Sequence, residues 1–354
     1  MLSRVANSLY WMSRYLERAD NTARLVDVNL QLFLDFRSLD DRALADRWIP
    51  IVQSAGDETL FNTLHGRASG RTVTEFLVFQ PENHNSILAA VTQARENARM
   101  VRDQITLEVW EELNRLYLFL RSPPARQQLD SSPVEFFHEI KASSLYLQGL
   151  TNATVVRNEG WLFQQAGMYL ERADKTSRIL DVRHTVFPAH GAPAPVNQAG
   201  ALEWAAVLRS CSAWDAYKSM HGADVQPALV AEYLLLSPEF PRSVRFCVQT
   251  LNATLRGISG SASDRFANDA ERLSGRLLAQ LQFTTAAEIF GTGLHAYIDE
   301  LQARLNAIGE ALFQAYIFQP FLTPDNGQLQ QQEEQQQQRR TAAAVPTLQV
   351  SSGR

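Results

Sequence analysis

The feature that most constrains the fold is a segment of fourteen residues that occurs twice. Tyr15–Val28 reads YLERADNTARLVDV, and Tyr169–Val182, 154 positions further along, reads YLERADKTSRILDV. Ten of the fourteen positions are identical, and the match needs no insertion. Because a long match at one offset is the signature of an internal duplication, we expect two similar halves in this chain.

The composition of the repeated segment predicts a helix. Ala, Leu, Arg and Glu dominate both copies, and neither copy contains Gly or Pro. At about 100° per residue, the charged positions lie on one arc and the apolar positions lie opposite them, which predicts an amphipathic helix. The apolar side chains that we expect at the centre of the molecule are Leu16, Ala19, Ala23, Val26, Leu170, Ala173 and Leu180.

The match between the halves continues beyond the first helix. Trp48 and Gly66 recur as Trp204 and Gly222, and the segment FLVFQPENHNSI at 76–87 is matched by YLLLSPEFPRSV at 233–244. No segment shows the alternating pattern of a β-strand. The sequence therefore predicts an all-α fold, a tandemly duplicated helical bundle with a pseudo-twofold relation. We expect one repeat at 1–157, a second at 158–320, and a disordered, Gln-rich tail at 321–354.

Composition and charge narrow the class of protein. The net charge of −5 is not the basic signature of a nucleic-acid-binding protein. The chain has no apolar run long enough to span a bilayer and no signal peptide, so we expect a cytoplasmic protein without membrane contact. Cys211 and Cys247 are far apart and lack a CxxC partner, so neither a disulfide framework nor a structural zinc site is expected.

The two YLERAD segments, with RENARMVRDQITLEVWEELN at 95–114 and IFGTGLHAYIDELQARL at 289–305, resemble the alpha-E family. The resemblance covers residues 1 to about 318. It implies an α-helical domain that occurs as a tandem duplication. It also implies an association with circularly permuted ATP-grasp ligases, transglutaminase-like proteins and an Ntn-hydrolase peptidase. That context points to a peptide synthesis or modification system, and it assigns no reaction to the helical protein.

Ten charged side chains of the repeated segments form the first candidate site. One interpretation is that Arg and carboxylate groups of the two copies pair with each other, partly buried. A second is that they bind a ligand, and a third is a solvated helix face. We expect Glu17 and Glu171 to be structural, and Arg18 and Arg172 to lie nearer an accessible groove. The ten residues are Glu17, Arg18, Asp20, Arg24, Asp27, Glu171, Arg172, Asp174, Arg178 and Asp181.

A second candidate set lies on one predicted helix between Ser86 and Asn114. Its arginines share a stripe that could bind a phosphate or a carboxylate-rich peptide, or could pair with acids of the same surface. The second half has NATLR where the first has RENAR, so only one half would carry such a site. The residues are Arg95, Glu96, Asn97, Arg99 and Arg102, with Glu108, Trp110 and Asn114 further along.

We expect neither a metal nor a cofactor. Carboxylate-bridged metal bundles use a Glu-x-x-His motif, but Asp20 and Asp174 stand where that motif needs His. The seven histidines do not cluster at metal spacing, and His65 and His221, each before a Gly, are interpreted as structural residues at helix ends.

The resemblance to the alpha-E family implies a non-catalytic or co-catalytic partner of an ATP-grasp peptide or amide ligase, which would bind the ligase, its peptide product or both. Two alternatives stay open. The protein could be an enzyme that acts on a peptide or a phosphorylated intermediate through its Glu/Arg clusters. It could also be a self-assembling structural protein without a ligand.

Overall fold

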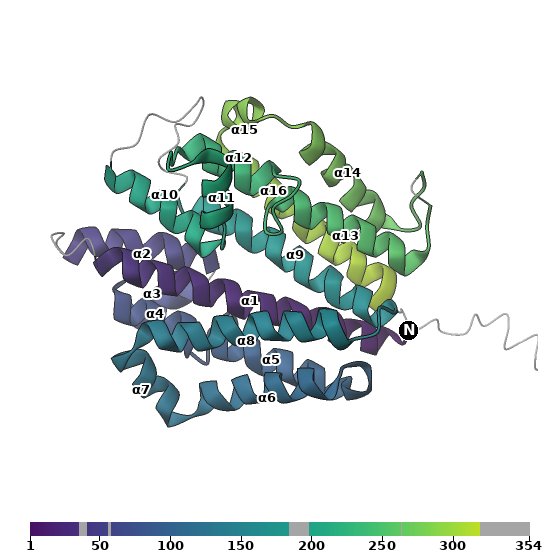
Figure 1. Ribbon diagram of the computed structural model, residues 1–354, viewed down its shortest axis with the longest axis horizontal. Helices are drawn as coiled ribbons and strands as arrows, with labels where there is room; N and C mark the ends of the chain where they lie inside the picture. The colour runs from purple at the N-terminus through teal and green to yellow at the C-terminus, as the bar shows by residue number, and fades with distance from the viewer. Residues whose placement is uncertain (35–40, 56–57, 184–197, 263, 319–354) are drawn as a thin grey trace, which may run out of the picture. The chain divides into compact units, whose positions relative to one another are not determined.

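The computed structural model describes residues 1–34, 41–55, 58–183, 198–262 and 264–318 (Figure 1). In these ranges the regular structure is helical and contains no β-strand, which confirms the predicted all-α class. Contacts group Met1–Ile317 into one compact unit. The predicted Gln-rich tail at 321–354 lies outside the described residues. The boundary predicted between the repeats at residues 157 and 158 stays a prediction.

The helices are given in the order of the chain. Those of the first part are α1 (Ser3–Leu34), α2 (Asp41–Ala55), α3 (Glu58–His65), α4 (Gly70–Val78), α5 (Ile87–Met100), η1 (Arg102–Gln104), α6 (Leu107–Arg121), α7 (Pro123–Ser131) and α8 (Pro133–Thr154). Those that follow are α9 (Glu159–Asp181), α10 (Gln198–Ser210), α11 (Trp214–His221), α12 (Pro227–Leu236), α13 (Val244–Ser259), α14 (Asp269–Phe283), α15 (Ala286–Thr292), α16 (Leu294–Leu312) and η3 (Phe313–Ile317).

The two copies of the repeated segment lie on α1 and α9, which pack against each other along much of their length (Figure 1). Helices α5 and α8 also pack on α1, whereas α13 and α16 pack on α9. Both faces of α1 are therefore covered, and its charged residues Glu17, Asp20 and Asp27 are as buried as its apolar ones. The prediction of a separate charged face was wrong because α1 is an interior helix.

The expected central apolar side chains are buried, except that Leu16 is half-buried. A glycine lets the two central helices approach closely. A Cβ atom built on Gly167 of α9 would lie 2.2 Å from the carbonyl oxygen of Tyr10 on α1. No side chain fits at that distance, so the backbones meet there directly.

Matching positions of the two halves have matching local roles. Ser86 caps α5 by accepting from the Ala89 amide at 3.2 Å, and Ser243 caps α13 by accepting from the Phe246 amide at 3.1 Å. Gly66 and Gly222 follow α3 and α11 with φ of 67° and 68°, a backbone conformation that favours glycine. The pseudo-twofold relation of whole halves stays a prediction.

The single helix predicted between Ser86 and Asn114 is instead broken. α5 ends at Met100, a short turn of 3₁₀-helix follows, and α6 begins at Leu107. Val101 and Ile105 are buried in this turn, whereas Met100 and Leu107 beside them are exposed. The chain must change direction between α5 and α6 to bury these two apolar side chains. Their burial outweighs the helical sequence pattern of this segment.

In the described part of the chain, no helix combines the length and the apolarity needed to cross a membrane.

Candidate functional site

The Glu-Arg pairs of α1 and α9 bind each other crosswise. Arg172 donates from Nε and Nη2 to the two carboxylate oxygens of Glu17, both at 2.8 Å. In the other direction, Arg18 donates from Nε at 2.7 Å and from Nη2 at 3.2 Å to Glu171. These are bidentate Arg–carboxylate pairs, the strongest geometry for this kind of contact. Each glutamate thus binds the arginine that follows the other.

A further arginine joins each crossed pair. Arg242, between α12 and α13, donates to Glu17 at 2.9 Å and to Asp20 at 2.7 Å. Arg14, one turn before Arg18, donates to Glu171 at 2.7 Å. Each buried glutamate therefore accepts from two guanidinium groups, and their positive charges favour its ionised form.

The network keeps both glutamates ionised. Burial alone would raise the pKa of Glu17, but the charges of Arg172 and Arg242 outweigh it and lower the pKa to about 2. Burial opposes ionisation of Glu171 as well, and Arg14 and Arg18 hold its pKa far below the ordinary value. A carboxylate with so low a pKa cannot donate a proton near neutral pH, so these groups suit pairing and not acid catalysis.

The burial and pairing of the Glu-Arg residues test the interpretations of the repeated charges. Glu17 is 1% exposed and Glu171 is fully buried, so the solvated-face interpretation is wrong for the Glu-Arg pairs. The crossed ion pairs expected from the first interpretation are present. The side chain of Arg172 is only 6% exposed, and therefore the expectation that it lies beside an accessible groove was wrong. Arg18 is partly exposed, although Glu171 holds its guanidinium.

The remaining repeated charges are held by neighbours. Asp20 accepts from Arg24 at 2.9 Å, and Asp174 accepts from Arg178 at 2.9 Å, both as pairs one helical turn apart. The last aspartate of each copy differs in its partner. Asp27 binds Lys141 of α8, whereas Asp181 binds His295 of α16.

Sequence reasoning missed Arg242, although a signal was present. In the matched segments at 76–87 and 233–244, Arg242 occupies the position of Asn85. Asn85 accepts from Arg18 at 2.8 Å, so it lies beside one crossed pair as Arg242 lies beside the other. Comparison of the two matched segments position by position would have paired Arg242 with Asn85, and the structure shows that both lie beside a Glu-Arg pair.

The second candidate set lies at the end of α5 and over α6. Arg95 donates to Asn114 at 2.8 Å and to Glu96 at 2.8 Å, and its guanidinium lies 4.5 Å from the centre of the Tyr117 ring. Arg102 lies 4.7 Å from the centre of the Trp110 ring. The cations therefore stack on aromatic faces of α6.

The other members of this set are more exposed. Arg99 donates to Glu96 at 2.8 Å, with side chains 57% and 41% exposed. Asn97 donates to the Gln93 carbonyl of its own helix, and Arg102 lies in the turn after α5 and not on the predicted helical stripe. The set is thus an open surface of arginines over aromatic rings, with partial internal pairing.

The thiols of Cys211 and Cys247 are both buried. Burial raises the pKa of both Cys211 and Cys247 to about 12. Neither thiol forms a reactive thiolate near neutral pH, so these cysteines suit packing and not nucleophilic catalysis.

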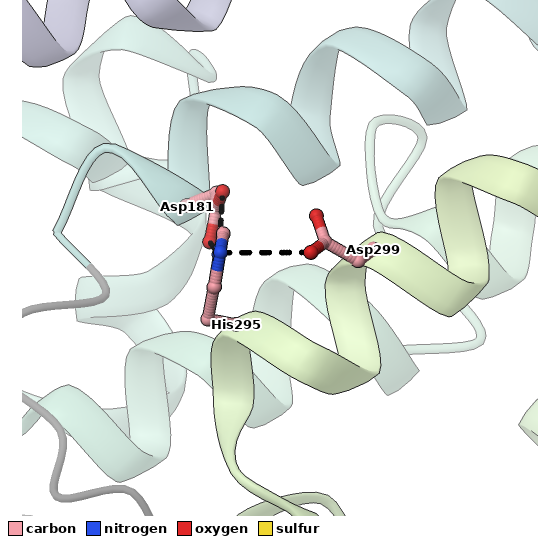
Figure 2. A group of neighbouring side chains, drawn as sticks. All are labelled: Asp181, His295 and Asp299. Carbon is pink, nitrogen blue, oxygen red and sulfur yellow. Dashed lines mark hydrogen bonds and ion pairs between the residues drawn. The ribbon is translucent and has the colours of Figure 1, made fainter.

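The fold also brings together three residues that the sequence did not combine. Asp181, His295 and Asp299 lie side by side where α9 ends and α16 begins (Figure 2). Asp181 lies 114 positions from His295, so spacing along the chain gave no sign that it joins His295 and Asp299.

Comparisons with known proteins place the chain in a family. A family model described as "a predicted alpha-helical domain with a conserved ER motif", named Alpha-E, matches residues 1–317. "Uncharacterized protein Mb2597" of Mycobacterium bovis and "Uncharacterized protein Rv2567" of Mycobacterium tuberculosis are each 26% identical over 327 residues, covering 86% of this chain. The chain spans 35% of the length of these curated relatives. No solved structure matches significantly. Because the family model covers nearly all of the described residues, the chain belongs to the Alpha-E family.

Proposed function

We propose that this chain is a helical binding component of a peptide synthesis or modification system. It would act with a circularly permuted ATP-grasp ligase and a transglutaminase-like protein. The observation that carries the proposal is that the two sets of charged residues in this chain differ in exposure. The Glu-Arg motif is closed inside the molecule, whereas the arginines at the end of α5 remain open on the surface.

The closed motif supports a structural role for its glutamates. Glu17 and Glu171 are buried and ionised by two arginines each, so they neither donate protons nor reach a substrate without the helices parting. Their contacts join α1, α9 and the segment before α13. The motif therefore holds α1 in place, and α5, which carries part of the recognition surface, packs on α1.

The open surface has the chemistry of a protein contact. Arg95 and Arg102 stack on Tyr117 and Trp110, and Met100 and Leu107 beside the turn are 65% and 61% exposed. Arginine, tryptophan and tyrosine are the residues that most often dominate the binding energy of interfaces. Guanidinium groups also bind carboxylates with two parallel hydrogen bonds. We assign this surface to a carboxylate-bearing surface of the ligase.

Co-purification with a circularly permuted ATP-grasp ligase of the same organism, co-expressed with this chain, tests the proposal. We expect the wild-type pair to co-purify and the chain alone to show no turnover. The double variant Arg99→Glu and Arg102→Glu should lose the ligase while keeping its circular dichroism spectrum and melting temperature. Arg265→Glu is the matched control, because the Arg265 side chain is 83% exposed and lies far along the chain from α5. Equal recovery of the ligase with wild type and double variant would contradict the assignment.

A further inference from the structure

The cluster at the end of α9 combines an imidazole with two carboxylates. Asp181 is the last residue of α9, and His295 and Asp299 lie one turn apart on α16 (Figure 2). Residues four apart on a helix present their side chains on the same face. The side chains of His295 and Asp299 are 51% and 61% exposed, so solutes reach them directly. One ligand atom from each residue lies within 4.8 Å of the others.

The two ring nitrogens of His295 have different neighbours. Nδ1 lies 2.9 Å and 3.1 Å from the two oxygens of Asp181, and Nε2 lies 3.5 Å from an oxygen of Asp299 (Figure 2). A carboxylate at Nδ1 favours the proton on that nitrogen and leaves the lone pair on Nε2. A carboxylate–histidine pair of this kind commonly stands behind a histidine that binds a metal.

The distance between Nε2 of His295 and the Asp299 carboxylate fits two ligands of one metal ion. With metal–ligand bonds of about 2.0–2.1 Å, neighbouring ligands of a tetrahedral zinc ion are about 3.4 Å apart. The distance of 3.5 Å between His295 Nε2 and Asp299 is close to that value. A neutral imidazole and a carboxylate are both ligands that Zn²⁺ accepts.

A cavity of about 350 Å³ adjoins the cluster and has room for further ligands. Asp181, His295 and Asp299 line it together with Gln302, which follows Asp299 on α16. Gln302 lies seven positions after His295, so its amide oxygen belongs to the same face of the helix. Arg178 is the cation that lines this cavity, and its Nε is bound to Asp174 at 2.9 Å.

We propose that His295 and Asp299 bind a divalent transition-metal ion, with Zn²⁺ as the reference ion, and that Asp181 orients the imidazole from behind. Water molecules in the cavity complete the coordination. The corresponding aspartate of the first copy supports this assignment by contrast. Asp27 is 5% exposed and is closed by the ammonium of Lys141, which excludes a cation, whereas a histidine meets Asp181 beside an open cavity.

Isothermal titration calorimetry of the metal-free full chain with Zn²⁺ tests the proposal. We expect one equivalent to bind, and Co²⁺ at the same position to give the visible absorption of a site with nitrogen and oxygen ligands. His295→Ala and Asp299→Asn should each weaken binding at least as strongly as Asp181→Asn. Asp181→Asn should weaken the affinity for Zn²⁺ about 10–100-fold, as loss of an orienting carboxylate typically does.

Two controls exclude binding elsewhere and loss of structure. His138→Ala removes an exposed histidine of α8, and it should leave the affinity for Zn²⁺ unchanged. Asp299→Asn changes an exposed side chain without changing its size, so its circular dichroism spectrum should match the wild type. The proposal is overturned if the wild type binds no Zn²⁺, or if His295→Ala and Asp299→Asn bind it as tightly as the wild type.

Discussion

The buried Glu-Arg motif and the surface at the end of α5 use the same residue types for different purposes. Around Glu17 the arginines come from distant parts of the chain, and every charged group is enclosed. Around Glu96 the arginines come from the same helix and remain partly in water. An enclosed ion pair must stay complete, because loss of one partner leaves a charge without solvent. An exposed pair can open and exchange its partner for another molecule.

The largest expected effect comes from breaking the enclosed network on one side. Glu17→Gln keeps the size of the side chain but leaves Arg172 without its carboxylate and Arg242 with that of Asp20 alone. Removal of one partner of a buried pair typically costs about 3–5 kcal/mol, and we expect a loss of unfolding free energy in this range. Urea denaturation followed by circular dichroism measures it. A loss below about 1 kcal/mol would show that solvent reaches the site.

Acid should weaken the same network. The pKa of Glu17 is lowered from 4.5 to about 2 in the folded chain, so the folded state holds the ionised form more tightly than the unfolded state. Its contribution is complete above pH 4.5 and is lost as the pH falls towards 2. We expect the wild type to lose stability faster than Glu17→Gln over this window. Parallel curves for the two proteins would contradict the lowered pKa.

A smaller effect is expected where the two central helices touch. Gly167→Ala places a methyl group against the backbone of Tyr10, and overpacking of this kind typically costs about 1–3 kcal/mol. Gly149→Ala in α8 is the matched control, since its Cβ would meet no atom within 4 Å. There the gain in helix propensity should stabilise the protein by up to about 1 kcal/mol. Thermal melts of both variants distinguish the sites, and equal melting temperatures would refute the close approach.

The smallest effect is expected at the exposed surface. Glu96→Gln removes the carboxylate that Arg95 and Arg99 share, yet the side chain is 41% exposed and water replaces the lost contacts. We expect the unfolding free energy to change by no more than about 0.5 kcal/mol. A loss above about 2 kcal/mol in the same urea titration would make this surface structural and remove the contrast with Glu17.

The sequence predicted the all-α class and the contact between the two repeated segments. Identical charges in both copies of YLERAD indicated specific partners, and the Glu-Arg pair of each copy binds that of the other. The helical class followed from composition and local pattern. What could not be predicted depends on which faces are covered. The charged arc of α1 is characteristic of a surface helix, and the packing of other helices around α1, among them α5, α8 and α9, makes that arc interior.

Contacts between residues far apart in the sequence were the second feature that could not be predicted. Lys141 and His295 approach equivalent aspartates from helices that have no matching sequence around them. The break after Met100 was missed because the charged pattern of α5 continues into α6, while two buried side chains between them decide the direction of the chain. Predictions from local pattern fail at such positions because tertiary burial overrides propensity.

The central claim is that the Glu-Arg motif holds α1 and α9 together by crossed, enclosed ion pairs. A double-mutant cycle with Glu17→Gln, Arg172→Met and the combined variant measures the coupling between the two side chains. We expect the combined variant to be less destabilised than the sum of the single variants by about 1–3 kcal/mol, because the second change removes the charge that the first leaves unpaired. Single effects that add within about 0.5 kcal/mol would show that the two residues do not act as a pair, and would contradict the account.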